Sequence, residues 1–208
     1  MPDEPGESDL LRHYDLRFFK GATVTYEERI DTLHHMIRAY LSTLYILHVE
    51  TWIAHGTLLG WWWNSQILPW DWDIDVQVTG KSLEYLGEFF NFTTHTYNSG
   101  GVERRYFLDV NPYHVERTRG NGDNIIDARW IDIATGLFID ITGVSEVDPV
   151  NHPGKWMCKN EHEYATGDLW PLRETIFEGV PALVPFGYYE ILIREYKSKA
   201  LVLTEYEG

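Results

Sequence analysis

Cysteine and long apolar runs are both scarce in this sequence. Cys158 is the only cysteine among 208 residues, so the chain cannot form an intrachain disulfide, and a redox pair or cysteine-based zinc site is disfavoured. No segment approaches the roughly 18 consecutive apolar residues of a membrane-spanning helix, and the acidic N-terminus is unlike a signal peptide. We therefore expect the chain, as given, to be soluble.

Basic residues are also few. Lys and Arg total 17 against 32 Asp and Glu, which gives a formal net charge of −15. A surface with this balance repels a phosphate backbone, so we expect no nucleic-acid partner. The excess of carboxylates can serve solubility alone, or a few of them can converge on a divalent cation, and only their positions separate these interpretations.

The composition is otherwise that of a folded protein. Hydrophobic residues make up 44% of the chain and charged residues 24%, and no internal repeat or low-complexity tract is present. We predict a single domain over residues 13–208, preceded by a mobile N-terminal tail over residues 1–12.

The spacing of apolar residues predicts an α/β (α+β) fold in which helices flank a mixed sheet. Helices are expected over residues 27–47, 57–64, 81–90 and 186–196, with Thr57 as the N-cap of the second. Strands are expected over residues 51–54, 74–78, 106–110, 129–133 and 137–142. Residues 145–168 lose this periodicity, which predicts a long functional loop.

Three carboxylates at alternate positions lead into one predicted strand. Asp71, Asp73 and Asp75 are two residues apart and so point to one side of the chain. A solvated acidic turn would explain them, but Trp70 and Trp72 between them favour a pocket. Clustered anions are destabilising unless a cation neutralises them. We predict that Asp73 and Asp75 bind Mg²⁺ or Mn²⁺, with Asp71 as an additional ligand.

A third acid is expected on a later strand, and two residues qualify. Asp132 and Asp140 each lie between apolar residues of a predicted strand. A buried carboxylate is costly unless it is paired or bound to a metal, although an arginine partner or an open hairpin position would also explain it. We prefer Asp140 as the third metal and catalytic acid and keep Asp132 as the alternative.

Further residues are candidates for binding a phosphorylated substrate. Gly56 and Thr57 lie where a strand turns into a helix, and free N–H groups at such a turn favour phosphate oxygens. His55 precedes them and is a candidate for substrate contact, although a structural role is equally compatible with its position. Arg104 and Arg129 could clamp a diphosphate, while ion pairs with neighbouring acids explain them equally well.

Residues 52–78 resemble the signature of the LicD/fukutin family, which belongs to the nucleotidyltransferase superfamily. The segment HGTLLG is followed by ILPWDWDID, and the superfamily pattern is a glycine turn, an Asp-x-Asp strand and a third acid on a later strand. Thr57 departs from the usual Gly or Ser, and Trp72 stands where bacterial members tend to carry another Asp. The likeness extends over about residues 33–196, and the run of three tryptophans at 61–63 resembles a fungal branch associated with mannosylphosphate addition to cell-wall glycans.

The resemblance implies a nucleotidyltransferase-like fold and a metal-dependent phosphotransferase. Such an enzyme moves a phosphorylated sugar or alcohol from a nucleotide diphosphate donor, such as GDP-mannose, to a glycan hydroxyl, such as one of cell-wall mannan. Related branches use CDP-choline or CDP-ribitol. The family also implies the Golgi lumen or secretory pathway. Two alternatives remain: a true nucleotidyltransferase that releases pyrophosphate, and a non-catalytic glycan-binding or regulatory partner of a transferase.

Overall fold

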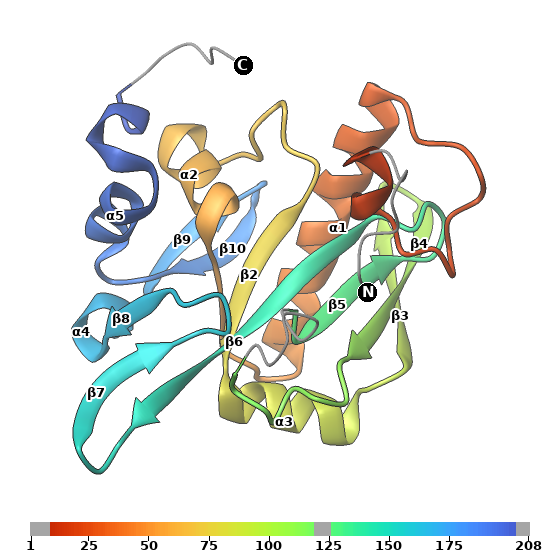
Figure 1. Ribbon diagram of the computed structural model, residues 1–208. Helices are drawn as coiled ribbons and strands as arrows, with labels where there is room; N and C mark the ends of the chain where they lie inside the picture. The colour runs from red at the N-terminus through yellow and green to blue at the C-terminus, as the bar shows by residue number, and fades with distance from the viewer. Residues whose placement is uncertain (1–8, 119–125, 203–208) are drawn as a thin grey trace.

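An eight-stranded mixed sheet organises the chain in a computed structural model that describes residues 9–118 and 126–202 (Figure 1). The main path of the sheet follows the order β1-β2-β6-β5-β4-β3. β2 and β6 are parallel, and the other neighbours on this path are antiparallel. The strands of this path are β1 (Thr51–Ile53), β2 (Ile74–Thr79), β3 (Thr93–Ser99), β4 (Val102–Val110), β5 (Ala128–Asp132) and β6 (Phe138–Asp148).

Helices and a separate hairpin surround this sheet. The helices are α1 (Tyr26–Ile46), α2 (His55–Asn64), α3 (Gly80–Phe89), α4 (Thr166–Leu169) and α5 (Tyr188–Ala200), after a short 3-10 helix, η1 (Asp9–His13). α1 lies behind the sheet in Figure 1, while α2 and α5 lie side by side beyond β2. The strands β9 (Arg173–Phe177) and β10 (Val180–Val184) pair with each other, and β10 packs against β1 and α1.

Alternation along β2 divides the sheet into an apolar face and a polar face. Ile74, Val76 and Val78 are fully buried and belong to one hydrophobic core with α1 and α3. Asp75 and Gln77 lie between them and therefore point to the opposite face. Burial of the apolar face is worth about 25 cal/mol per Å² removed from water, so the register that turns Asp75 away from the core is strongly favoured.

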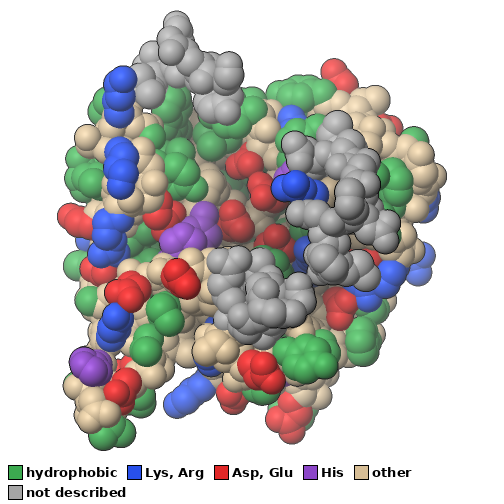
Figure 2. All heavy atoms as spheres, in the orientation of Figure 1, with side chains coloured by type: hydrophobic (Ala, Val, Ile, Leu, Met, Phe, Trp, Pro, Cys, Tyr) green, Lys and Arg blue, Asp and Glu red, His purple; other side chains and the backbone are tan. Residues whose placement is uncertain are grey.

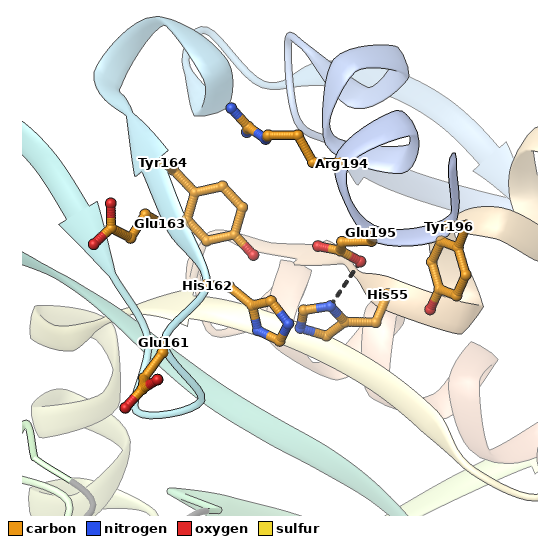
Figure 3. A pocket seen from close by; sticks show the side chains of 8 residues that line it. All are labelled: His55, Glu161, His162, Glu163, Tyr164, Arg194, Glu195 and Tyr196. Carbon is orange, nitrogen blue, oxygen red and sulfur yellow. Dashed lines mark hydrogen bonds and ion pairs between the residues drawn. The ribbon is translucent and has the colours of Figure 1, made fainter. Parts of the chain in front are cut away.

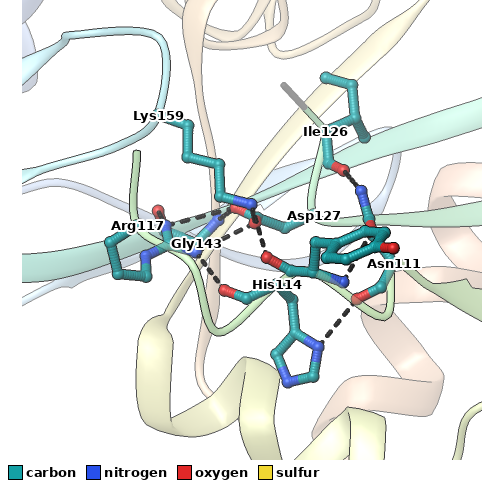
Figure 4. A network of polar contacts seen from close by, with 8 residues as sticks. Asn111, His114, Arg117, Ile126, Asp127, Gly143 and Lys159 are labelled. Atoms are coloured by element: carbon teal, nitrogen blue, oxygen red, sulfur yellow. Dashed lines mark hydrogen bonds and ion pairs between the residues drawn. The ribbon is translucent and has the colours of Figure 1, made fainter. Parts of the chain in front are cut away.

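A buried ion network fixes two loops to the sheet (Figure 4). The Asp127 carboxylate is inaccessible to solvent and accepts from the Arg117 guanidinium at 3.0 Å, the Lys159 ammonium at 2.8 Å and the Gly143 backbone N–H at 2.8 Å. Removing one partner would leave a buried charge uncompensated. The network therefore holds the segment around Lys159, three residues before His162, against β6.

The mixed sheet flanked by helices confirms the predicted fold class. The long helix, the short first strand and the strand bearing Asp75 all lie within one or two residues of their predicted limits. The mobile tail over residues 1–12 and the domain over residues 13–208 stay predictions, because residues 1–8 lie outside the described residues; η1 covers Asp9–His13.

Two predictions about local structure are wrong. Residues 145–168 are not a structureless loop, because β6 continues to Asp148 and pairs with β7 (His152–Met157), which pairs with β8 (Glu163–Ala165). Thr57 is not the N-cap of α2, because the helix begins at His55 and Ala54 is its N-cap. The Thr57 hydroxyl instead accepts from the Asp75 backbone N–H at 2.9 Å. No helix within residues 9–118 and 126–202 is long and apolar enough to cross a membrane.

Candidate metal and substrate site

Two acids face each other across the parallel pair of strands. Asp75 on β2 stands directly opposite Asp140 on β6, so their side chains leave the same face of the sheet side by side. Asp73 precedes β2 and interacts electrostatically with both of them. Asp71 interacts electrostatically with both Asp73 and Asp75. The structure thus brings together four of the five acids that the sequence singled out.

The cations among the described residues balance the charges of these acids only in part. Burial and the neighbouring carboxylate of Asp73 raise the pKa of Asp71 to about 8. Burial raises the pKa of Asp75 to about 7, with His55 opposing the shift and the other acids adding to it. Burial also raises the pKa of Asp140 to about 6, although Arg129 works in the opposite direction. Each shift means that ionising the carboxyl is unfavourable here unless a cation is added.

The donor set fits a hard divalent cation. Carboxylate oxygens are the ligands that Mg²⁺ and Mn²⁺ prefer. No hydrogen bond from the residues that the structure describes engages the Asp75 carboxylate, so its oxygens remain available as ligands. Figure 2 shows acidic side chains gathered at the centre of this face of the molecule, beside histidine.

The register separates the two candidates for the third acid. Asp132 pairs with Tyr106, and Trp130 of the same strand pairs with Ile139, so Asp132 lies on the core side of the sheet, opposite to Asp140. Its carboxylate accepts from the Thr135 backbone N–H at 3.1 Å and the Thr135 hydroxyl at 2.7 Å. Asp132 therefore stabilises the β5–β6 turn and is not part of the acid cluster.

Of the two candidate arginines, one reaches the acids. Arg129 stands opposite Asp140 on β5, and its guanidinium lies 3.2 Å from the Asp140 carboxylate and 3.9 Å from the centre of the Phe138 ring. Its side chain is 37% exposed, which leaves it able to contact a ligand. Arg104 lies on the core side of β4 and pairs with Asp31 of α1 at 2.6 Å, so it is not brought to the acids.

The glycine turn lies next to the acid cluster. A Cβ atom on Gly56 would be 3.3 Å from a carboxylate oxygen of Asp71, so the backbone at this position closely approaches the acids. Thr57 is buried, and its hydroxyl is committed to the Asp75 backbone. Gly56, which has no side chain, can contact a ligand only through its backbone. The Thr57 side chain positions Asp75.

A cavity of about 610 Å³ adjoins these acids, lined in part by His55, His162, Glu195 and Tyr196 (Figure 3). His55 Nδ1 lies 3.0 Å from a Glu195 carboxylate oxygen. Burial opposes the charged form of His55, but the bond to Glu195 outweighs it and raises the pKa of the imidazole. Burial, with His55 nearby, lowers the pKa of His162. Donor atoms of His55, His162 and Glu195 lie within 4.8 Å of one another, so these three could also hold a metal ion.

Glu195 was not identified as a site residue in the sequence analysis. Glu195 lies on α5, 140 residues from His55, and no local spacing links the two. The three tryptophans at 61–63 lie on α2, and two of them donate their indole N–H groups to backbone carbonyls at the end of α5. These tryptophans hold α5 in place beside α2.

A family model described as "LicD/FKTN/FKRP, nucleotidyltransferase domain" matches residues 48–186, about two thirds of the chain. The chain belongs to the LicD family. The match contains Gly56, the three acids before and in β2, and Asp140, and it ends before α5 and Glu195. The resemblance that the sequence motifs indicated is thereby confirmed.

Two curated relatives of this LicD domain come from Saccharomyces cerevisiae. "Mannosyltransferase regulator 4" is 40% identical over 135 residues, and "Mannosyltransferase regulator 14" is 36% identical over 139 residues. Each alignment covers 64% of this chain but only 12% and 14% of the respective relative. The chain thus matches a small part of each protein. Both relatives are fungal, which agrees with the fungal branch suggested by the sequence.

Proposed function

We propose that this LicD domain is a divalent-metal-dependent phosphotransferase that acts in the mannosylphosphate modification of glycans. Its donor would be a nucleotide diphosphate carrying a sugar or alcohol, GDP-mannose in the first instance, and its acceptor a hydroxyl of a mannose-rich glycan. The observation that carries the proposal is the direct opposition of Asp75 and Asp140 on neighbouring parallel strands, with Asp73 and Asp71 beside them.

Each residue has a proposed part in this reaction. Asp73, Asp75 and Asp140 would hold Mg²⁺ or Mn²⁺, with Asp71 as an additional ligand. The bound ion would neutralise charge on the diphosphate. Arg129 would contact phosphate oxygens from the Asp140 side, and the backbone at Gly56 would do so from the α2 side.

The transfer balances as a displacement at phosphorus. An oxygen of the acceptor hydroxyl would attack the phosphorus that bears the sugar, a P–O bond forms, and the bond to the bridging oxygen breaks. A nucleoside monophosphate leaves, and the hydroxyl proton passes to a carboxylate of the site. The product is a phosphodiester. We propose the Golgi lumen or secretory pathway as the location of this chemistry, and the family likeness supports that proposal.

A second candidate function is favoured by the names of the relatives. Both are called regulators of a mannosyltransferase, which supports a domain that binds a glycan or a partner transferase without turnover. A true nucleotidyltransferase would use the same acids but release pyrophosphate. The three functions therefore differ in the product that is released. The phosphotransferase releases a nucleoside monophosphate, the nucleotidyltransferase releases pyrophosphate, and the regulator releases nothing.

The test is nucleotide release from GDP-mannose, CDP-choline, CDP-ribitol and UDP-sugars, with Mn²⁺ and a mannose-rich acceptor. The control is the double variant Asp73→Asn/Asp75→Asn, which keeps size and removes two charges. Monophosphate released by the native protein alone supports phosphotransfer and identifies the donor. Pyrophosphate would indicate nucleotidyl transfer, and no release together with no Mn²⁺ binding by calorimetry would favour the regulator.

A further inference from the structure

The cavity beside the acids is separate from them yet opens next to them. It lies between β8, the loop before it and α5, and about 610 Å³ is within the roughly 300–1,000 Å³ of small-ligand sites (Figure 3). The Tyr196 hydroxyl, on its wall, is 3.9 Å from where a Cβ on Gly56 would lie, and that position is 3.3 Å from Asp71. A ligand in the cavity would thus have one end near the acid cluster.

The charge of the cavity selects against anions. Glu161, Glu163 and Glu195 line it, with Arg194 as the single arginine among its lining residues. That guanidinium already pairs with Asp168 at 3.0 Å. Two of the carboxylates are also paired, Glu163 with Lys155 at 2.8 Å and Glu195 with His55 at 3.0 Å. The three carboxylates still outnumber the one arginine of the lining, and this excess of negative charge is unfavourable for a phosphate. The cavity is therefore better suited to a neutral ligand.

Buried hydrogen bonds behind the cavity fix the orientation of two residues that line it, Tyr164 and His55. The Trp52 indole N–H donates to the Gln77 side-chain oxygen at 3.0 Å, which turns the Gln77 amide nitrogen towards the Tyr164 hydroxyl at 3.2 Å and His55 Nε2 at 3.4 Å. In the neutral imidazole Nδ1 then carries the hydrogen, which it donates to Glu195. Each of these polar groups has a defined orientation, as recognition of sugar hydroxyls requires.

The same chain of hydrogen bonds disfavours a metal at His55, His162 and Glu195. A metal on His55 Nδ1 would displace its hydrogen, and the neutral ring would then carry a hydrogen on Nε2, facing the Gln77 amide nitrogen. Two donors would oppose each other, because the bond from Trp52 prevents the amide from rotating.

We propose that this cavity binds an uncharged sugar residue of the acceptor glycan, with Glu195 and the Tyr164 hydroxyl contacting its hydroxyl groups. That this sugar belongs to the acceptor rests on the proposed function, whereas the binding of a neutral saccharide in the cavity does not. A domain without turnover would bind the same ligand in the same cavity. Glu195 lies outside the residues that match the family model, so this assignment depends on the geometry alone.

The test is calorimetric titration of the protein, in EDTA, with α-linked mannobiose, its 6-phosphorylated form and guanosine. We expect mannobiose to bind at least about tenfold more tightly than the phosphorylated form, because of the three carboxylates. Binding should persist in the Asp73→Asn/Asp75→Asn variant, which separates this proposal from nucleotide release. Failure of the donor assay alone would therefore leave the saccharide site intact.

Variants distinguish recognition from general damage. Glu195→Gln should weaken mannobiose binding about tenfold or more. It should also reduce the ratio of the affinity for mannobiose to the affinity for phosphorylated mannobiose, because one charge that repels the phosphate is gone. Tyr164→Phe should weaken mannobiose binding without changing that preference. Glu174→Gln, an exposed glutamate on β9 outside the cavity, is the matched control and should change neither.

Three results would overturn the proposal. One is the absence of mannobiose binding by the folded native protein, and another is equal or tighter binding of the phosphorylated form or of guanosine. The third is stoichiometric Zn²⁺ or Mn²⁺ binding that survives in Asp73→Asn/Asp75→Asn and disappears in Glu195→Gln, which would make the cavity a metal site.

Discussion

At the scale of single residues, the sheet register decides which carboxylates can act together. Asp140 and Asp132 have nearly identical sequence surroundings, each between apolar residues on a strand. Only the pairing of β5 with β4 and β6 reveals that they point to opposite faces. The sequence could therefore nominate both acids but could not choose between them on physical grounds.

The two aspartates should differ sharply when substituted. Asp140→Asn removes a proposed ligand and should raise the Mn²⁺ dissociation constant by more than about tenfold, measured by calorimetry. Asp132→Ala should leave Mn²⁺ affinity unchanged and lower the free energy of unfolding by about 1–3 kcal/mol, because Thr135 loses its acceptor. If Asp132→Ala weakened Mn²⁺ binding and Asp140→Asn did not, Asp132 and not Asp140 would be the third metal ligand.

Thr57 is expected to act through Asp75. Replacing it with Val removes the acceptor of the Asp75 backbone N–H, and an unsatisfied buried donor costs about 1–3 kcal/mol. Urea unfolding should report this loss, and Thr57→Ser, which keeps the hydroxyl, should recover most of it. If Val and Ser variants are equally stable, the hydroxyl has no such role.

At the scale of elements, the sequence predicted what local periodicity determines. The helix α1 and the strand β2 carry regular apolar spacing and were located closely. The strands β3 and β7 were missed because their residues are mainly polar or include proline and glycine, and β8, with 3 residues, is too short to show an alternating pattern. Each of them pairs with a neighbour along the chain. Glu195 was missed for a different reason, since α5 meets α2 only in the folded chain.

The turn after α2 depends on the absence of a side chain at Gly60. A Cβ there would lie 2.5 Å from the Gln66 carbonyl oxygen and 3.2 Å from the Leu68 nitrogen, and both are backbone atoms. Gly60→Ala should therefore destabilise the protein by about 1–3 kcal/mol and weaken Mn²⁺ binding, since the displaced turn leads to Asp71. Unfolding and calorimetry measure the two effects.

Gly167→Ala is the matched control for Gly60→Ala. Gly167 is also helical, and nothing lies within 4 Å of its Cβ position. Alanine favours helix over glycine by up to about 1 kcal/mol, so this variant should be unchanged or slightly more stable. A stabilising Gly60→Ala would contradict the steric argument.

At the scale of the whole molecule, stability should depend on pH and metal together. The pKa values of Asp71, Asp75 and Asp140, at about 8, 7 and 6, lie above the value near 3.9 of an unfolded aspartate. At pH values between the unfolded pKa and each folded pKa, the folded protein thus binds more protons than the unfolded chain does. Its free energy of unfolding should be highest at low pH within this window and fall as pH rises through each folded pKa.

We expect the metal-free protein to lose several kcal/mol of stability between pH 5 and pH 8, measured by urea unfolding in EDTA. Mn²⁺ should restore more stability at pH 8 than at pH 5, because it binds the ionised acids. The Asp71→Asn/Asp75→Asn variant should show a flatter pH dependence. Stability that rises with pH in EDTA would contradict the raised pKa values.

The parallel pairing of β2 with β6 also bears on how the protein folds. Between these two neighbouring strands the chain passes through α3, β3, β4 and β5. Asp75 and Asp140 are therefore joined by a contact of long sequence separation, which forms slowly compared with hairpins. Mn²⁺ affinity should consequently appear late in refolding, after most secondary structure, so that the ion reports on completion of the native topology.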